Sequence, residues 1–193
     1  MIRPVVILEG AAGTGKTTVA TILAEILGCP VYRPFRGQDN NNHLPGADGR
    51  LKELGFKTNT WVEDLYTADV LSAVIPRVVL DRSMPSGLAY DGKLDLSQRG
   101  SAMALWSERL SAIATLFLLQ MPEGARRVRS GQRFYDWEAQ AILDECCKAG
   151  MFGVKLISVD AMCTPQEIAW DIFVCVAFSR FGTSLRDMQV NPA

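Results

Sequence analysis

VVILEGAAGTGKTT, from Val5 to Thr18, contains the motif that most strongly predicts the fold of this chain. An apolar, β-branched run ends at Gly10, and Gly15 to Thr17 complete the spacing G-x-x-x-x-G-K-[ST] of a phosphate-binding P-loop. The run before the loop predicts a strand, and residues 18–27 predict a helix, which is the context that this motif requires. Because glycine makes up roughly 7% of average sequence, such a match arises by chance on the order of once in a hundred chains of this length.

In a P-loop, the glycines let successive backbone N–H groups point at phosphate oxygens, and the next helix directs its positive end at them. We expect Lys16 to reach the β- and γ-phosphates and the Thr17 hydroxyl to bind Mg²⁺. The sequence therefore predicts a site for ATP with Mg²⁺. The residues expected to bind the nucleotide are those of the loop and first helical turn, with one later arginine: Gly10, Ala11, Ala12, Gly13, Thr14, Gly15, Lys16, Thr17, Thr18 and Arg126.

Length and composition favour one α/β domain over residues 1–193, since 48% of the residues are hydrophobic. The formal charge of −1 provides no general attraction to nucleic acids or acidic membranes. The odd number of cysteines, five, shows no metal-ligand spacing and favours a reduced, cytoplasmic protein. No apolar run approaches the roughly 18–20 residues that cross a bilayer, and no leader precedes Val5, so we expect a soluble intracellular protein.

Beyond the loop, predicted strands and helices alternate, as is typical of a parallel sheet. The polar run 36–49, with the only histidine, His43, predicts a loop, and the tail after Gly182 is expected to fray. The predicted strands are 4–8, 30–33, 77–81, 115–120 and 153–159. The predicted helices are 16–27, 60–75, one that Ser97 or Ser101 caps and that ends near 113, 134–147, and one that starts at Thr164–Pro165. In the helix 134–147, the spacing places Trp137 and Ile142 on one apolar side, and we expect Cys146 and Cys147 to be packing thiols.

The third predicted strand ends in Asp81, which has the form of a Walker B strand whose carboxylate holds Mg²⁺ directly or through water. Residues 82–90 follow at the carboxyl end of that strand. Ligands bind at this edge in open α/β sheets. We therefore expect Asp81, like Thr17, to be a metal ligand.

Four arginines follow the fourth predicted strand, in the segment 122–133: Arg126, Arg127, Arg129 and Arg133. A solvated basic helix face is the plainer interpretation of such a run. However, guanidinium groups match phosphate oxygens in geometry, and phosphoryl transfer needs cations around the transferred group. We therefore favour a functional role, in which these arginines act on the transferred phosphate.

The order of these parts resembles the thymidylate kinase and deoxynucleoside kinase branch of the P-loop nucleotide kinases, over nearly the whole chain. The motifs that carry the resemblance are Ile7–Gly10 leading into Gly15–Thr18, Asp81-Arg82-Ser83 with Ser86 and Ala89-Tyr90, Leu65–Asp69, and Val159–Ala161. The resemblance implies a three-layer α/β sandwich, with a five-stranded parallel sheet in the order 2-3-1-4-5.

The resemblance also implies roles for individual residues. Tyr66 would stack on the acceptor base, Tyr90 would pack beside the sugar, and Ser86 would line the acceptor site with Arg82. Arg82 and Arg33 would reach toward the phosphate or hydroxyl of the acceptor. The implied catalytic residues are Lys16, Arg33, Asp81, Arg82 and Arg129. The resemblance also implies that the arginine-rich segment 122–133 forms a lid that closes over the donor nucleotide and excludes water.

Three positions depart from the thymidylate kinase pattern. Ala12 stands where those enzymes carry a carboxylate for the 3′-hydroxyl of the acceptor, Val70 replaces an arginine, and Arg-Glu-Pro is reduced to Arg33-Pro34. The leading hypothesis is a deoxynucleoside monophosphate kinase, with a small-molecule nucleotide as its partner and a homodimer as a candidate assembly. The alternatives are a kinase for a hydroxyl of a nucleoside or of a hydroxymethyl pyrimidine in DNA, and a nucleotide-binding switch without an acceptor.

Overall fold

The computed structural model describes residues 5–32, 77–90, 94–131 and 135–178. The expected helix at 60–75, the expected loop at 36–49 and the tail after Gly182 lie outside these ranges, so they stay predictions. Within the described residues, no helix is long and apolar enough to cross a membrane.

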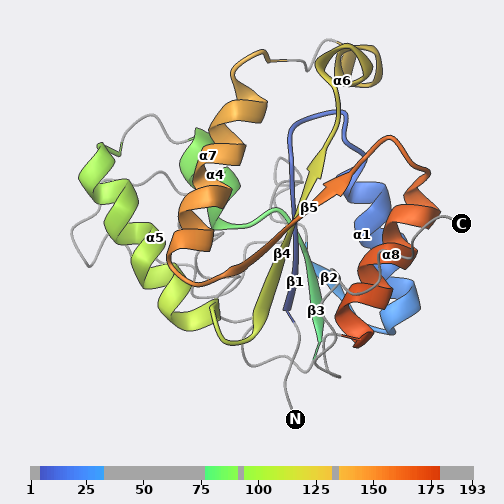
Figure 1. The fold of residues 1–193 in the computed structure, drawn as a ribbon, viewed down its shortest axis with the longest axis horizontal. Coiled ribbons are helices and arrows are strands. Elements are labelled where there is room, and N and C mark those ends of the chain that lie inside the picture. Colours follow the sequence, from blue (N-terminus) through green and yellow to red (C-terminus); the bar gives the residue numbers. More distant parts are fainter. Residues whose placement is uncertain (1–4, 33–76, 91–93, 132–134, 179–193) are drawn as a thin grey trace, which may run out of the picture.

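Five parallel strands form one sheet in the order β2-β3-β1-β4-β5, which confirms the predicted order (Figure 1). The strands are β1 (Val5–Glu9), β2 (Val31–Tyr32), β3 (Val78–Asp81), β4 (Ala114–Gln120) and β5 (Lys155–Asp160). Every residue of β1 and β3 is buried, as expected for strands whose two faces are both covered by helices. The P-loop therefore leaves the central strand of the sheet.

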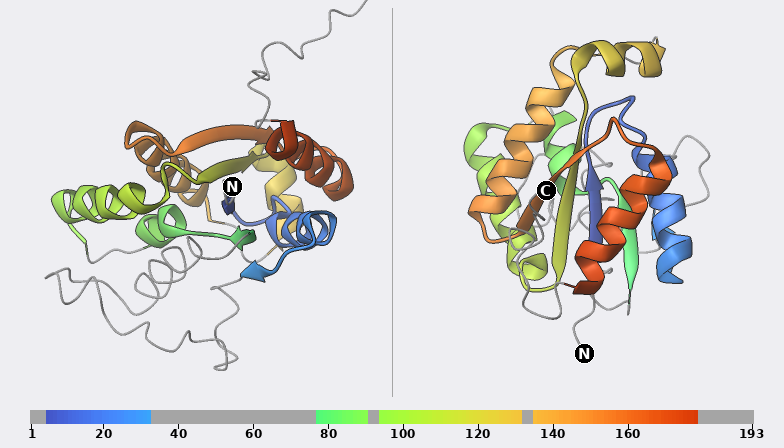
Figure 2. Two further views of the ribbon diagram at one scale, coloured as in Figure 1. Left: turned by 90° about the horizontal axis from the view of Figure 1, so that it is seen from below. Right: turned by 45° about the vertical axis from the view of Figure 1, so that its right-hand side comes forward.

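Helices cover both faces of the sheet, as Figures 1 and 2 show. On one face, α4 (Met84–Tyr90), α5 (Leu96–Leu110) and α7 (Glu138–Met151) pack around Trp106, Leu88 and Ile142. On the other face, α1 (Lys16–Leu27) and α8 (Pro165–Phe178) pack around Leu23, Phe117 and Ile172. These layers form the three-layer α/β sandwich that the resemblance implies.

The helix α6 (Glu123–Ser130) contains three of the four arginines of the expected lid. It lies across the carboxyl end of β4, on the same side of the sheet as the P-loop (Figure 1). The fourth arginine, Arg133, lies outside the described residues.

Two predicted helix starts were wrong. The residue that caps α5 is Asp95, whose carboxylate accepts a hydrogen bond from the Gln98 amide at 2.8 Å. The predicted caps, Ser97 and Ser101, lie inside the helix. The helix expected from residue 134 begins at Glu138.

Two residues expected to pack in the core are also exposed. Trp137, which was expected on the apolar side of the helix from residue 134, is instead 49% exposed. Cys146 and Cys147 were both expected to pack inside, but only Cys146 is buried. Adjacent positions on a helix point about 100° apart, so one apolar stripe takes one of them and leaves the other in water.

Candidate active site

The P-loop adopts the backbone conformation that its glycines were predicted to allow. Gly10, Gly13 and Gly15 have φ angles of 142°, 83° and 82°, which side chains other than glycine rarely adopt. A Cβ at Gly10 would lie 2.5 Å from the Leu119 carbonyl oxygen, and a Cβ at Gly13 would lie 2.8 Å from the Arg126 carbonyl oxygen. The loop backbone therefore lies directly against the backbone of β4 at Gly10 and against the backbone of α6 at Gly13.

Lys16 lies in the first turn of α1 and is only 6% exposed. Its Nζ donates a hydrogen bond to the Ala11 carbonyl oxygen at 2.8 Å, which folds the side chain over the loop. Burial, together with the Arg82 charge, lowers the pKa of Lys16 to about 7, against the opposing carboxylates of Asp81, Glu9 and Glu138. The ammonium group thus lies in a poorly solvated site where an anion would stabilise its charge.

An open hollow of about 460 Å³ lies in front of the loop. It brings together most of the expected nucleotide-binding residues with two of the expected catalytic arginines. Its lining consists of Ala12, Gly13, Gly15, Lys16, Thr17, Thr18, Arg82, Arg129 and Ser130. The volume lies within the range of small-molecule sites, and the residues present are phosphate-binding types.

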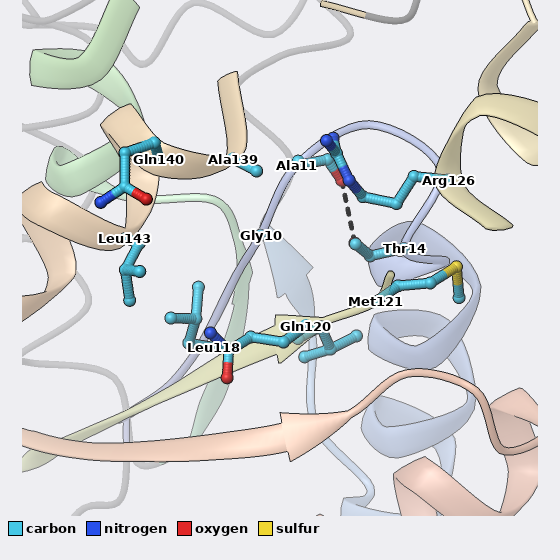
Figure 3. A pocket seen from close by; sticks show the side chains of 11 residues that line it. Gly10, Ala11, Thr14, Leu118, Gln120, Met121, Arg126, Ala139, Gln140 and Leu143 are labelled. Carbon is cyan, nitrogen blue, oxygen red and sulfur yellow. Dashed lines mark hydrogen bonds between the residues drawn. The ribbon is translucent and has the colours of Figure 1, made fainter. Parts of the chain in front are cut away.

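The other expected nucleotide-binding residues lie behind the loop. Gly10, Ala11, Thr14 and Arg126 line a smaller cavity of about 120 Å³ between the P-loop, the end of β4 and α7 (Figure 3). Arg126 is 3% exposed, and its side chain extends from α6 toward Ala11 in Figure 3. Arg129, from the same helix, is therefore the α6 arginine that reaches the hollow.

Asp81 and Thr17 are the residues that could hold a magnesium ion. Asp81 ends β3 next to the P-loop strand, and its charge acts on Lys16. Within the described ranges, no group of three or more His, Cys, Asp or Glu side chains could hold a metal. One carboxylate and one hydroxyl fit a Mg²⁺ ion that takes its remaining ligands from substrate phosphates and water.

Arg82 follows Asp81 with a φ of 79°, a left-handed conformation that costs energy for a residue with a Cβ. Its guanidinium donates to the Ser86 hydroxyl at 2.8 Å and pairs with the Glu138 carboxylate at 3.4 Å. It also lies 5.5 Å from the centre of the Tyr90 ring. The structure thus brings together three expected acceptor residues, Arg82, Ser86 and Tyr90.

Sequence reasoning did not single out Glu9, which is fully buried between β1 and α4. Its carboxylate accepts hydrogen bonds from the backbone amides of Ser83 and Ser86, at 2.8 and 3.3 Å, and from the Ser86 hydroxyl. Burial raises the pKa of Glu9, against the opposing charge of Arg82 and the hydrogen bonds from Ser86. An acidic residue that ends an apolar strand directly before Gly10 was the available signal.

Sequence reasoning also missed Glu138, the first residue of α7, which is 1% exposed. Its Oε2 accepts a hydrogen bond from the Ala12 amide at 2.9 Å. Its Oε1 accepts a hydrogen bond from the Tyr90 hydroxyl and pairs with the Arg82 guanidinium. Burial raises the pKa of Tyr90; the hydrogen bond to Glu138 also raises it, while the Arg82 charge opposes both. No local pattern identifies Glu138, since its partners lie 48 to 126 positions away.

Arg33 and Tyr66 lie outside the described residues, so their expected roles at the acceptor stay predictions.

Among the comparisons with known proteins, only the comparison with solved structures finds relatives in fold. No protein-family model matches the chain, and no curated protein matches it in sequence. Solved structures do match over most of their length. The YorR protein of Bacillus subtilis, in complex with phosphorylated GDP, has 19% identity and a TM-score of 0.63, covering 93% of this chain and 99% of that one.

The chain has the fold of the P-loop kinases. Shikimate kinase of Aquifex aeolicus is 16% identical with a TM-score of 0.56, covering 93% of this chain and 99% of that one. Deoxyadenosine kinase of M. mycoides, with bound dATP, is 16% identical with a TM-score of 0.55, covering 90% and 99%. At these sequence identities, the similarity shows the fold alone. It does not show that the chain belongs to the thymidylate kinase and deoxynucleoside kinase branch.

Proposed function

We propose that this protein is an ATP-dependent kinase that transfers the γ-phosphoryl group of Mg·ATP to a nucleotide, with a deoxynucleoside monophosphate as the leading acceptor. One observation carries the proposal. The phosphate-binding side of the P-loop, with Lys16, opens into the same hollow as Arg82, whose guanidinium is paired with the buried carboxylate of Glu138. Donor and acceptor groups would thus meet within one site.

In this proposal, the P-loop amides and Lys16 hold the β- and γ-phosphates, while Arg129 approaches from α6. Asp81 and Thr17 would hold Mg²⁺, which would neutralise part of the phosphate charge when bound. An acceptor oxygen attacks the γ-phosphorus as the bond to the β-phosphate oxygen breaks, and ADP leaves. Lys16 and Arg82 stabilise the negative charge on the transferred group, and both already line the hollow before a ligand binds.

Glu138 supports the acceptor half of the proposal. Thymidylate kinases, which the sequence resembles, carry a carboxylate for the acceptor hydroxyl at the P-loop position that Ala12 occupies here. In this chain, the Glu138 carboxylate contacts the backbone amide of that same residue. We infer that Glu138 supplies this carboxylate from α7 and accepts a hydrogen bond from a sugar hydroxyl, while Arg82 faces the acceptor phosphate.

A hydroxyl acceptor is the second candidate, on a free nucleoside or on a modified pyrimidine in DNA. A monophosphate oxygen is already ionised, whereas a hydroxyl needs a group that takes its proton. The Glu138 carboxylate is the one observation that favours this alternative, since it can accept a proton and is paired with Arg82, which lines the hollow.

The deciding experiment is an acceptor panel with ATP and Mg²⁺, run in parallel with nucleosides, nucleoside monophosphates, shikimate and DNA. We expect ADP release and phosphoryl transfer with at least one monophosphate. Lys16→Met is the matched inactive variant. Tight ATP binding without transfer to any acceptor would contradict the kinase proposal and favour the nucleotide-binding switch.

We also infer a cytoplasmic location and a homodimer from the resemblance to small nucleotide kinases. Light scattering on the purified chain tests the assembly, and a monomer across micromolar concentrations would contradict it.

A further inference from the structure

Three aromatic rings lie in a row beside the Arg82–Glu138 pair, and the proposed reaction does not yet use two of them. The rings of Tyr90 and Trp137 meet edge to face, with centroids 5.4 Å apart at 79°. Trp137 and Tyr135 lie 5.9 Å apart with their planes tilted by 35°. The helices α4 and α7 pack side by side (Figure 1). The row of rings lies where the end of α4 meets the start of α7, because Tyr90 ends α4 and Trp137 directly precedes α7.

The two outer rings expose much of their surface. Trp137 is 49% exposed and Tyr135 is 51% exposed, whereas Ile142 and Cys146 of the same helical stretch are completely buried. Large aromatic rings release the most free energy when they leave water, so two neighbouring half-exposed rings form a surface that a flat apolar partner would cover.

The position of these rings is set by the site itself. Trp137 directly precedes Glu138, whose carboxylate is held by the Ala12 amide and by Tyr90. The indole is also held by its contact with the Tyr90 ring, which lies next to the Arg82 guanidinium. The aromatic row therefore runs from the Arg82–Glu138 pair, through the partly buried Tyr90, to the half-exposed Trp137.

We propose that Trp137 and Tyr135 form a stacking platform for the heterocyclic base of the acceptor. This inference rests on the proposed kinase function and narrows it, since it requires an acceptor with a flat heterocycle at one end and a hydroxyl or phosphate at the other. A nucleoside or nucleotide has this form, whereas an aliphatic hydroxy acid does not. Stacking on aromatic side chains tolerates different bases, because every base has a π-face.

The test compares Trp137→Ala and Trp137→Phe with Trp170→Ala as the matched control. Trp170 is also about half exposed, at 56%, and also packs on another ring, Phe173 at 5.3 Å, but it lies on α8 across the sheet. Circular dichroism and the Tm establish that each variant folds. The acceptor KM and kcat are then measured, with ATP saturating, for the acceptors that the wild type uses.

We expect Trp137→Ala to raise the acceptor KM roughly tenfold, the fold-change for one lost base stack, with a much smaller change in kcat. Trp137→Phe should keep most of the affinity because it keeps a ring, and Trp170→Ala should match the wild type. Binding of a nucleotide acceptor should also quench wild-type tryptophan fluorescence by an amount that Trp137→Phe removes.

Two outcomes would overturn the platform while leaving the kinase function intact. One is phosphorylation of shikimate or a similar hydroxy acid with no activity on any nucleoside or nucleotide. The other is an equal acceptor KM for Trp137→Ala and Trp170→Ala. If no acceptor is phosphorylated, the kinase proposal fails, and calorimetric titration with nucleoside monophosphates decides the platform. Weaker binding by Trp137→Ala then supports it, and equal or undetectable binding overturns it.

Discussion

The Glu138 carboxylate accepts a hydrogen bond from the Ala12 backbone amide at 2.9 Å, although 126 positions separate the two residues. This contact joins the start of α7 to the P-loop. The same carboxylate faces the Arg82 guanidinium at 3.4 Å, so one buried acidic group links the phosphate-binding loop to the cation expected at the acceptor.

Glu138→Gln should lower phosphoryl transfer roughly 10- to 100-fold, because a hydrogen bond to a charged group is worth about 1.5–3 kcal/mol. The matched control is Glu145→Gln. Glu145 is equally buried on α7, but it pairs with Lys148 at 2.7 Å and with Arg99 at 3.8 Å. Steady-state kinetics and urea unfolding should show lost stability in both variants and lost transfer in Glu138→Gln alone. Similar losses of transfer in both would assign Glu138 a purely structural role.

ATP binding should take up protons above pH 7. Burial holds the pKa of Lys16 at about 7, below its ordinary value of 10.5, so the amine is largely neutral at pH 8 to 9. Bound phosphates favour the charged ammonium, and binding in this range therefore recruits up to about one proton. Calorimetry in two buffers of different ionisation enthalpy measures this number. Lys16→Arg, which does not titrate in this range, should show no uptake from this site.

The same pKa predicts how the stability of the unbound protein changes with pH. Between about pH 7 and pH 10.5, the unfolded chain carries a proton on Lys16 that the folded chain lacks. The free energy of unfolding should therefore rise with pH across this window, relative to Lys16→Met, which has no such proton. Urea unfolding at several pH values checks the difference, and parallel curves for the two proteins would contradict the lowered pKa.

Arg82→Gly and Arg82→Ala should both lower kcat/KM for the acceptor by about 10²-fold or more, since each removes the cation that we propose stabilises the transferred group. They should differ in stability. Because residue 82 has a φ of 79°, the glycine variant should be more stable than the alanine variant by about 1 kcal/mol. Denaturant unfolding compares the pair, and ATP affinity is measured separately. Loss of ATP binding with unchanged acceptor use would refute the acceptor role of Arg82.

Gly10→Ala should destabilise the protein more than Gly28→Ala. Both glycines have positive φ angles, 142° and 60°, but only at Gly10 would the new methyl group meet a backbone oxygen, at 2.5 Å. We expect a cost of roughly 1–2 kcal/mol at Gly28 from the left-handed conformation alone, and a larger cost at Gly10. The unfolding midpoints in urea measure the difference, and equal midpoints would show that the P-loop backbone can move away from β4.

Much of the fold could be predicted because its signals are local. A P-loop has a fixed spacing, a buried parallel strand is a short apolar run, and the sheet order confirms what the resemblance to nucleotide kinases implied. The donor half of the candidate site was predictable for the same reason, since Gly15, Lys16 and Thr17 are adjacent in the chain. Arg82 and Ser86 were expected together, and a direct hydrogen bond joins them.

The wrong predictions concerned helix starts and buried helix sides, where the local sequence pattern allowed more than one structure. The start of α5 offered several capping residues, and Asp95 rather than Ser97 or Ser101 makes the cap. For residues 134–147, helical spacing placed Trp137 in the core with Ile142. In the structure α7 begins at Glu138, directly after Trp137, and the indole packs on Tyr90 instead. Periodicity identifies the apolar side of a helix, but it does not give the residue at which the helix begins.

The spacing of adjacent residues was sufficient to predict a phosphate-binding loop between a buried strand and a helix. Which acidic group lies against this loop depends instead on contacts between residues far apart in the chain. Glu9 and Glu138 are ordinary glutamates in the sequence, and they become part of the site because folding buries them against amides and a guanidinium contributed by other elements. Burial of a charge is favourable only with such partners, and the fold of the whole domain supplies them.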